Sequence, residues 1–124
     1  MFTRQLRSIP SLAAQVHRGA RKLGSSHDLE AEIINKVVIN KVVIFSKSSC
    51  PYCRRVKQLF SDIDQPTHVV ELNEVKRGAD MQRVLQEMTG QRTVPNIFVN
   101  GKHLGGCDDT MAAHDDGRLK QMLE

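Results

Sequence analysis

Two cysteines, Cys50 and Cys53, are separated by a proline and a tyrosine in the sequence Cys-Pro-Tyr-Cys. The apolar run Val42–Phe45 precedes them and a helical pattern follows, which places both thiols where a strand ends and a helix begins. Unpaired backbone N–H groups and the helix dipole favour a thiolate at such a position. Pro51 suits the first helical turn, and the helix turns Cys53 back toward Cys50 as a candidate resolving thiol. The pair therefore indicates redox chemistry.

Three cysteines in the chain do not suit a disulfide scaffold, and one close pair favours catalysis over structural cross-linking. The third thiol is Cys107. A zinc-binding module is an alternative, because thiol and imidazole are zinc ligands, but the spacing differs from common zinc patterns. Its ligands would be Cys50, Cys53, His103 and Cys107. We therefore predict no metal ligands.

The elements that position the cysteines follow from apolar periodicity and turn signals. A helix is capped by Asp28, Gly90 ends another helix, and Asn100-Gly101 forms a hairpin turn. The predicted helices are 29–38, a helix from the cysteine pair to Asp62, one from Gly78 to Gly90, and a last helical region from Asp108 or Asp109 to about Leu123. The predicted strands are Val42–Phe45, His68–Leu72, Pro95–Val99 and Lys102–Leu104.

The pentapeptide Asn-Lys-Val-Val-Ile occurs twice in tandem, at Asn35–Ile39 and Asn40–Ile44. The second copy runs into the cysteine pair, so we assign it to a buried strand and the first copy to the end of the preceding helix. Val and Ile disfavour helix only mildly, so packing can overrule propensity. A continuous strand over Asn35–Phe45 is the alternative.

The element order predicts an α/β protein with a four-stranded mixed sheet flanked by helices. Two parallel strands are joined by a crossover helix, and an antiparallel pair follows. This arrangement fits a thioredoxin-like fold.

The length of 124 residues suits one compact domain. The net charge of +4 comes from residues 1–27, which hold five of the 18 basic residues and none of the 14 acidic ones, so the remainder carries −1. This distribution argues against a nucleic-acid partner. No apolar stretch has the length of a membrane span, so we expect no membrane partner either.

Residues 1–27 also contain serines and small apolar residues between the arginines, which allows an amphipathic helix. The segment is similar to a mitochondrial transit peptide. We therefore expect a mitochondrial protein. The alternative is a disordered basic tail on a cytoplasmic protein.

Three segments resemble the signature segments of dithiol glutaredoxins: Phe45–Cys53, Thr93–Pro95 and Gly105–Asp109. Three such segments in the right order are far more specific than one cysteine pair. Thioredoxin itself typically carries Trp-Cys-Gly-Pro-Cys, whereas this chain contains no Trp. The resemblance covers residues 28–124, which we predict to be a glutaredoxin domain.

The resemblance implies a glutathione-dependent thiol-disulfide oxidoreductase with glutathione as co-substrate. Its partners would be glutathionylated and disulfide-containing proteins. Cys50 would attack a glutathionylated protein and retain glutathione as a mixed disulfide, which a second glutathione reduces. For a protein disulfide, Cys53 would resolve the intermediate. The first route needs Cys50 alone, whereas the second needs both thiols.

The resemblance also implies a glutathione site. Lys47 would help to stabilise the thiolate and attract a glutathione carboxylate, and Tyr52 would form a wall beside the glutathione sulfur. In Thr93–Pro95 the final proline is cis in the family, which turns the Val94 backbone toward glutathione. The full set is Lys47, Tyr52, Gln82, Arg92, Thr93, Val94, Pro95, Gly106, Cys107 and Asp108.

At the two ends of glutathione, Gly106 would permit close backbone approach, and the N–H groups of Cys107 and Asp108 would hold the γ-glutamyl carboxylate. Gln82 and Arg92 match family positions that contact the glycine end.

Simpler roles compete with these assignments. Lys47 also suits an exposed solubilising charge, and Gln82 and Arg92 suit polar surface. For Cys107 we favour a passive buried role, and for Asp109 a capping or solvent-facing one.

Some glutaredoxins bind a [2Fe–2S] cluster as dimers, through one active-site Cys from each chain and two glutathiones. Pro51 counts against this alternative, because members that bind clusters more readily usually have Ser there or lack the second Cys. We hold cluster binding as a minor activity and expect a monomer.

Overall fold

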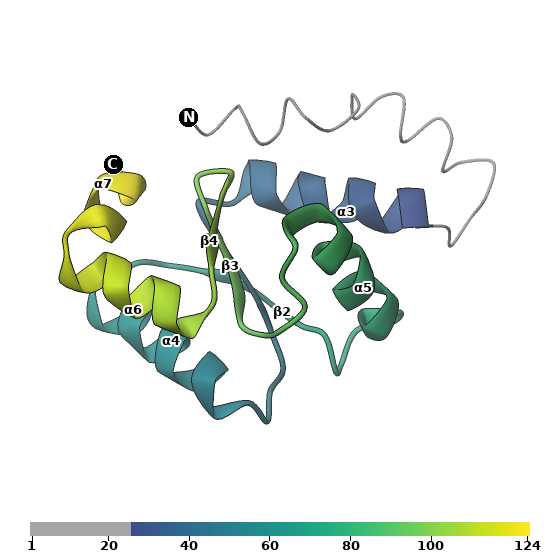
Figure 1. The fold of residues 1–124 in the computed structure, drawn as a ribbon, viewed down its shortest axis with the longest axis horizontal. Helices are drawn as coiled ribbons and strands as arrows, with labels where there is room; N and C mark the ends of the chain where they lie inside the picture. Colours follow the sequence, from purple (N-terminus) through teal and green to yellow (C-terminus); the bar gives the residue numbers. More distant parts are fainter. Residues whose placement is uncertain (1–25) are drawn as a thin grey trace.

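A four-stranded sheet with helices on both faces carries the cysteine pair (Figure 1). The computed structural model describes residues 26–124. The helices are α3 (Ser26–Ile39), α4 (Pro51–Asp62), α5 (Gly78–Thr89), α6 (Cys107–Asp115) and α7 (Arg118–Leu123). The strands are β1 (Val42–Ser46), β2 (His68–Glu71), β3 (Asn96–Val99) and β4 (Lys102–Gly105). The predicted architecture is confirmed.

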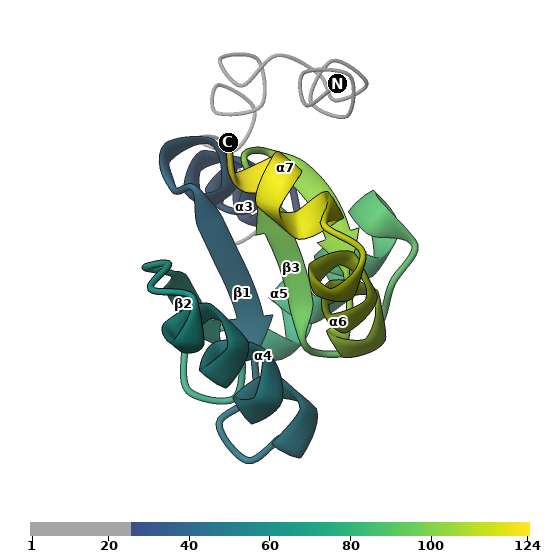
Figure 2. The ribbon, with the colours of Figure 1, turned by 90° about the vertical axis from the view of Figure 1, so that its left-hand side faces the viewer.

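The sheet has the order β2-β1-β3-β4. Strands β1 and β2 are parallel, with Ser46 opposite Glu71 at the end of the ladder. Strand β3 pairs antiparallel with β1 on one side and with β4 on the other. Parallel neighbouring strands need a crossover connection, so α4, which follows β1 and precedes β2 in the chain, packs over one face of the sheet. The cysteines therefore lie where the central strand meets the crossover helix, as Figure 2 shows for β1 and α4.

Apolar side chains of β1 point alternately to two cores. Val43 and Phe45 pack with α3 and α5, whereas Val42 and Ile44 pack with α4, α6 and α7. Figure 1 shows these two groups of helices on opposite faces of the sheet. A strand covered on both faces needs a continuous apolar run, which explains the sequence before Cys50.

The tandem pentapeptide has the two structures that were predicted for its copies. Asn35–Ile39 lies in α3, and Val42 opens β1. Within this copy Val37 is buried whereas Val38 and Ile39 are exposed, so the packing of Val37 offsets the mild helix preference of the β-branched residues. The alternative of one continuous strand is excluded.

The start of α3 differs from the prediction. The helix begins at Ser26, so Asp28 lies in its first turn and is not the N-cap. A carboxylate in the first turn is still stabilised by the positive end of the helix dipole. The predicted transit peptide falls almost entirely on residues 1–25, which lie outside the described residues, and the boundary before residue 28 stays a prediction.

Other boundaries differ as well: β1 ends at Ser46, β4 ends at Gly105, and α6 begins at Cys107 rather than at Asp108 or Asp109. Leu72 lies just beyond β2 and Pro95 just before β3. The last helical region is two helices, because Gly117 takes a φ of 88° between α6 and α7. The backbone N–H of Arg118 then donates to the Asp116 carboxylate at 3.0 Å, which starts α7. In the described part of the chain, no helix is long and apolar enough to span a membrane.

Candidate active site

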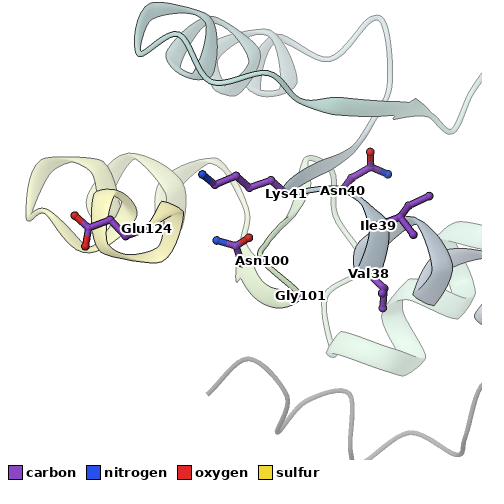
Figure 3. A pocket seen from close by; sticks show the side chains of 7 residues that line it. All are labelled: Val38, Ile39, Asn40, Lys41, Asn100, Gly101 and Glu124. Atoms are coloured by element: carbon purple, nitrogen blue, oxygen red, sulfur yellow. The ribbon is translucent and has the colours of Figure 1, made fainter.

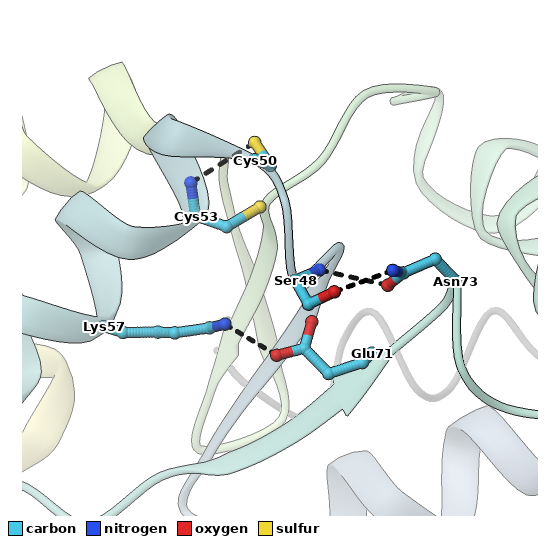
Figure 4. Close-up of polar contacts among 6 residues, drawn as sticks. All are labelled: Ser48, Cys50, Cys53, Lys57, Glu71 and Asn73. Atoms are coloured by element: carbon cyan, nitrogen blue, oxygen red, sulfur yellow. Dashed lines mark hydrogen bonds and ion pairs between the residues drawn. The ribbon is translucent and has the colours of Figure 1, made fainter.

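Cys50 is the N-cap residue of α4, with extended backbone angles of φ −86° and ψ 119°. Pro51 is the first helical residue, where its missing N–H leaves no hydrogen bond unmade. The backbone N–H of Cys53 donates to the Cys50 sulfur at an N–Sγ distance of 3.4 Å (Figure 4). The sulfur therefore occupies the place that a Ser or Asp oxygen takes in other helix caps.

The pKa values of the two thiols are shifted in opposite directions. Partial burial works against ionisation of Cys50, but hydrogen bonds from Cys53 and the Tyr52 backbone, together with the Arg54 charge, lower its pKa overall. Full burial raises the pKa of Cys53, and the neighbouring Cys50 adds to this, against weaker opposing effects of the Lys47 backbone and the Ser46 hydroxyl. Cys50 is therefore the more reactive thiol, and Cys53 is held protonated.

A surface groove of about 740 Å³ lies beside the pair. The Cys50 sulfur is 3.9 Å from the carbonyl oxygen of Val94, and the Val94–Pro95 peptide bond is cis. Tyr52 is 56 % exposed on the same groove. Seven residues assigned to the glutathione site from the sequence line it together: Tyr52, Thr93, Val94, Pro95, Gly106, Cys107 and Asp108.

Gln91 holds the groove together and was missed in the sequence. Its side-chain Nε2 donates to the carbonyl oxygens of Thr93 at 3.1 Å and Pro95 at 2.9 Å. These two hydrogen bonds link the residues before and after Val94 to the same side-chain amide. In the sequence, Gln91 was recognisable only as an amide directly after Gly90, which ends the helix. Nothing in the sequence indicated that it binds the Thr93 and Pro95 carbonyls. Arg55 also lines the groove and was not predicted.

The start of α6 forms the far wall of the groove. The backbone N–H of Gly106 donates to the Asp109 carboxylate at 3.0 Å, so Asp109 caps this helix. Asp108 is exposed, whereas Cys107 is 7 % exposed. Burial raises the pKa of the Cys107 thiol, and the charge of Asp108 adds to this effect against that of Arg55. Cys107 is therefore a poor nucleophile.

The remaining predicted residues, Lys47, Gln82 and Arg92, line a separate hollow of about 400 Å³. The Gln82 side-chain amide donates to the Arg92 carbonyl at 2.8 Å, which joins α5 to the loop before Thr93. Two cations and an amide around one hollow suit a carboxylate. Arg83 lines the same hollow and was not predicted.

The zinc alternative does not agree with the structure. Within residues 26–124, no three His, Cys, Asp or Glu side chains lie close enough together to hold a metal ion. The His103 ring pairs with Asn96 in a contact of 2.8 Å between Nε2 and Oδ1.

Another hollow, of about 580 Å³, lies at the opposite end of β1 (Figure 3). It is lined by the end of α3, the β3–β4 turn and Glu124, and no cysteine or predicted site residue contributes to it. The redox chemistry therefore belongs to the groove beside Cys50.

A helix-capping thiol of lowered pKa, a buried thiol one turn later and a cis-proline segment on this fold define a thiol-disulfide oxidoreductase of the thioredoxin-like class. The glutaredoxin family model matches residues 42–104. Glutaredoxin-C4 of Arabidopsis thaliana is 50 % identical over 95 residues, which cover 76 % of this chain and 70 % of that protein. The Vernicia fordii glutaredoxin is 51 % identical over 84 residues, covering 68 % and 81 % of the two chains.

A solved structure of a buckwheat glutaredoxin-glutathione complex has a TM-score of 0.78 and 43 % identity, covering 79 % of this chain and 89 % of that one. The chain belongs to the glutaredoxin family and is a glutathione-dependent oxidoreductase.

Proposed function

We propose that the protein reduces protein-glutathione mixed disulfides through Cys50 alone and protein disulfides through Cys50 and Cys53. The observation that carries this proposal is the hydrogen bond from the Cys53 backbone to the Cys50 sulfur. It stabilises a thiolate on Cys50 through the backbone, in addition to the larger effect of the protonated Cys53 side chain. One residue can therefore act as nucleophile while the other waits as a protonated thiol.

In the first route, the Cys50 thiolate attacks the glutathione sulfur of a glutathionylated protein. A disulfide forms between Cys50 and glutathione, and the protein thiol leaves as a thiolate that takes up a proton. A glutathione thiolate then attacks the bound glutathione sulfur. Oxidised glutathione leaves, and Cys50 returns to its thiolate state.

In the second route, Cys50 attacks a protein disulfide and forms a mixed disulfide with the substrate. Cys53 then loses its proton and attacks the Cys50 sulfur, which releases the reduced substrate. The Cys50–Cys53 disulfide is finally reduced by two glutathione molecules, which leave as oxidised glutathione. Two electrons pass from glutathione to the substrate.

Glutathione binding is proposed for the groove and for the separate hollow lined by Lys47, Gln82 and Arg92, and the relative that was solved with glutathione supports it. The Val94 backbone is suited to pair with the glutathione peptide, since its carbonyl already lies beside the Cys50 sulfur. The α6 N-terminus suits the γ-glutamyl carboxylate, with Asp108 near its amino group. Lys47 and Arg92 suit the glycine carboxylate.

We also propose that residues 1–27 direct the protein to mitochondria, on the basis of their basic, acid-free composition. A fluorescent fusion of residues 1–30 tests this. Diffuse cytosolic fluorescence would contradict it.

The catalytic proposal is tested with Cys50→Ser and Cys53→Ser in two assays. We expect Cys50→Ser to lose reduction of both a glutathionylated peptide and a protein disulfide. We expect Cys53→Ser to retain the first activity and lose the second. Activity of Cys50→Ser equal to that of the unmodified protein would overturn the mechanism.

A further inference from the structure

A polar cluster lies beneath Cys53, between α4 and the sheet. It consists of Ser46 on β1, Glu71 on β2 and Lys57 on α4. The Lys57 ammonium is 2.6 Å from Oε2 of Glu71. Figure 4 shows this ion pair on the same side of α4 as the Cys53 sulfur.

The fold explains why these residues meet. Lys57 follows Cys53 by four residues on α4, so the two share one helix face. Ser46 and Glu71 are register partners on the parallel strands β1 and β2. Along β1, Val42 and Ile44 face α4, so the alternation of the strand turns Ser46 to the same face.

Two polar atoms of the cluster are buried without hydrogen bonds. Within the described residues, neither the Ser46 hydroxyl oxygen nor Oε1 of Glu71 has a hydrogen-bond partner. A buried donor or acceptor without a partner is unfavourable, so a hydrogen bond to either atom would stabilise the protein. The Glu71 carboxylate is the stronger acceptor of a hydroxyl proton in the reduced protein, because Cys53 is then a neutral thiol.

Ser46 affects the pKa of two groups that can accept its proton: Glu71, its register partner, and Cys53 on the helix that covers the same face. Burial opposes ionisation of Glu71, but its contacts with Lys57 and Ser46 lower its pKa overall, so it is ionised at neutral pH. Ser46 also favours the ionised form of Cys53, against the larger effect of burial. A hydroxyl has one proton, so it cannot serve both acceptors at once.

We propose that Glu71, held by Lys57, competes with the Cys53 thiolate for the Ser46 hydroxyl proton and thereby slows the resolving step. Glu71 is a positioning residue in this role, since it acts on Cys53 through Ser46. The inference rests on the proposed function of Cys53 as the resolving thiol.

The step concerned starts from glutathione bound to Cys50 as a mixed disulfide. Cys53 loses its proton to solvent, and its sulfur attacks the Cys50 sulfur. The Cys50–Cys53 bond forms, the bond to glutathione breaks, and glutathione leaves as a thiolate that takes up a proton. The other titratable group that acts on Cys53 is Cys50, which is in the disulfide at this point and carries no charge.

When the Ser46 hydroxyl turns to Oε1 of Glu71, which has no partner in the structure, the Cys53 thiolate lacks a donor and the mixed disulfide lives longer. A long-lived mixed disulfide favours the route in which a second glutathione regenerates Cys50. The cluster therefore sets the division between the two routes.

The test follows the resolving step directly. Reduced protein is mixed with oxidised glutathione, quenched with acid, alkylated and analysed by mass spectrometry over time. Glu71→Gln should convert the Cys50-glutathione disulfide to the Cys50–Cys53 disulfide about threefold to tenfold faster at neutral pH, since the Ser46 proton becomes free for the thiolate. Ser46→Ala should convert it more slowly. The pH at which the rate is half-maximal should fall in the first variant and rise in the second.

The double variant Ser46→Ala/Glu71→Gln decides whether the effect passes through Ser46. Its rate should equal that of Ser46→Ala, because Glu71 then has no hydroxyl to compete for. Acceleration by Glu71→Gln that persists without Ser46 would overturn the proposal. So would a Glu71→Gln rate within the error of the unmodified protein.

Two controls separate this proposal from the proposed function. Asp116→Asn removes an exposed carboxylate paired with Arg118 and should leave the rate unchanged. Each variant combined with Cys53→Ser should react with oxidised glutathione at the same rate, since that step uses Cys50 alone. Failure of Cys50 to form a glutathione disulfide in the unmodified protein would overturn both proposals, whereas normal formation with unchanged resolution would overturn this one alone.

Discussion

The backbone N–H of Cys53 donates to the sulfur of Cys50 across 3.4 Å. The donor that stabilises the nucleophile therefore belongs to the residue that carries the second thiol. Because the donor is a backbone group, replacing the Cys53 side chain leaves it in place. The Cys53 side chain lowers the Cys50 pKa further, so a Cys53 variant keeps the backbone share of this stabilisation and loses the side-chain share.

The opposite acidities of the thiols predict selective alkylation at low pH. A thiol whose pKa is lowered stays partly ionised as the pH falls, whereas thiols whose pKa is raised are protonated. Iodoacetamide at about pH 6 should therefore modify Cys50 at least about tenfold faster than Cys53 or Cys107. Peptide mass mapping measures the three rates. Equal modification of Cys50 and Cys107 would contradict the prediction.

Gln91→Glu should weaken both stability and substrate binding. The change replaces the donor amide with a carboxylate facing the Thr93 and Pro95 carbonyls. We expect a loss of about 1–3 kcal/mol in the free energy of unfolding and a raised KM for a glutathionylated peptide. Denaturant unfolding and steady-state kinetics measure the two effects. Gln121→Glu makes the same change at an exposed position on α7 and should alter neither.

Substitutions of Asp109 should lower the stability of the protein, whereas substitution of Asp108 should weaken glutathione binding. Asp109→Ala removes the acceptor for the Gly106 N–H and should cost about 1 kcal/mol of stability, with Asp109→Asn costing less. Asp108→Ala removes an exposed carboxylate and should raise the KM for glutathione with little change in stability. Thermal unfolding and initial-rate measurements on the three variants test this. An equal loss of stability in Asp108→Ala would contradict it.

Two glycines that bound α5 should respond differently to alanine. A Cβ on Gly78 would collide with the Leu72 carbonyl, so Gly78→Ala should cost about 1–3 kcal/mol through forced backbone movement. Gly90 has a φ of +81° with open space around it, so Gly90→Ala should cost about 1 kcal/mol from conformation alone. Gly90→Asn should cost less than Gly90→Ala, because Asn tolerates this conformation. Denaturant unfolding ranks the three variants. Equal stability of Gly78→Ala and Gly90→Ala would show that the backbone near Leu72 adapts freely.

Most elements were predictable because their signals are local. The helix after Cys50 follows from an apolar stripe with Pro51 in the first turn, and the β3–β4 hairpin follows from Asn100-Gly101. Element ends were less predictable, since Gly117 divides the last helical region through a backbone conformation that the pattern of apolar residues does not contain. Asp28 was predicted as the cap, but α3 already begins at Ser26, two residues earlier.

The site shows the same division. The segments Phe45–Cys53, Thr93–Pro95 and Gly105–Asp109 were recognisable in the sequence, and the groove brings together Tyr52 from the first with parts of the other two. Gln91 was missed because its role depends on the carbonyls that the folded loop turns toward it. The Ser46–Glu71–Lys57 cluster was missed because its members have no shared motif.

The sequence by itself determined the chemistry and the family, because a reactive thiol pair at a helix start and a buried strand before it are written in short stretches of residues. Tertiary structure decided which residues surround each thiol. Ser46 and Glu71 are 25 positions apart, and only the parallel register of β1 and β2 places them together beneath Cys53. Acidity depends on burial and on neighbours in space, so the difference between the two thiols is a property of the fold.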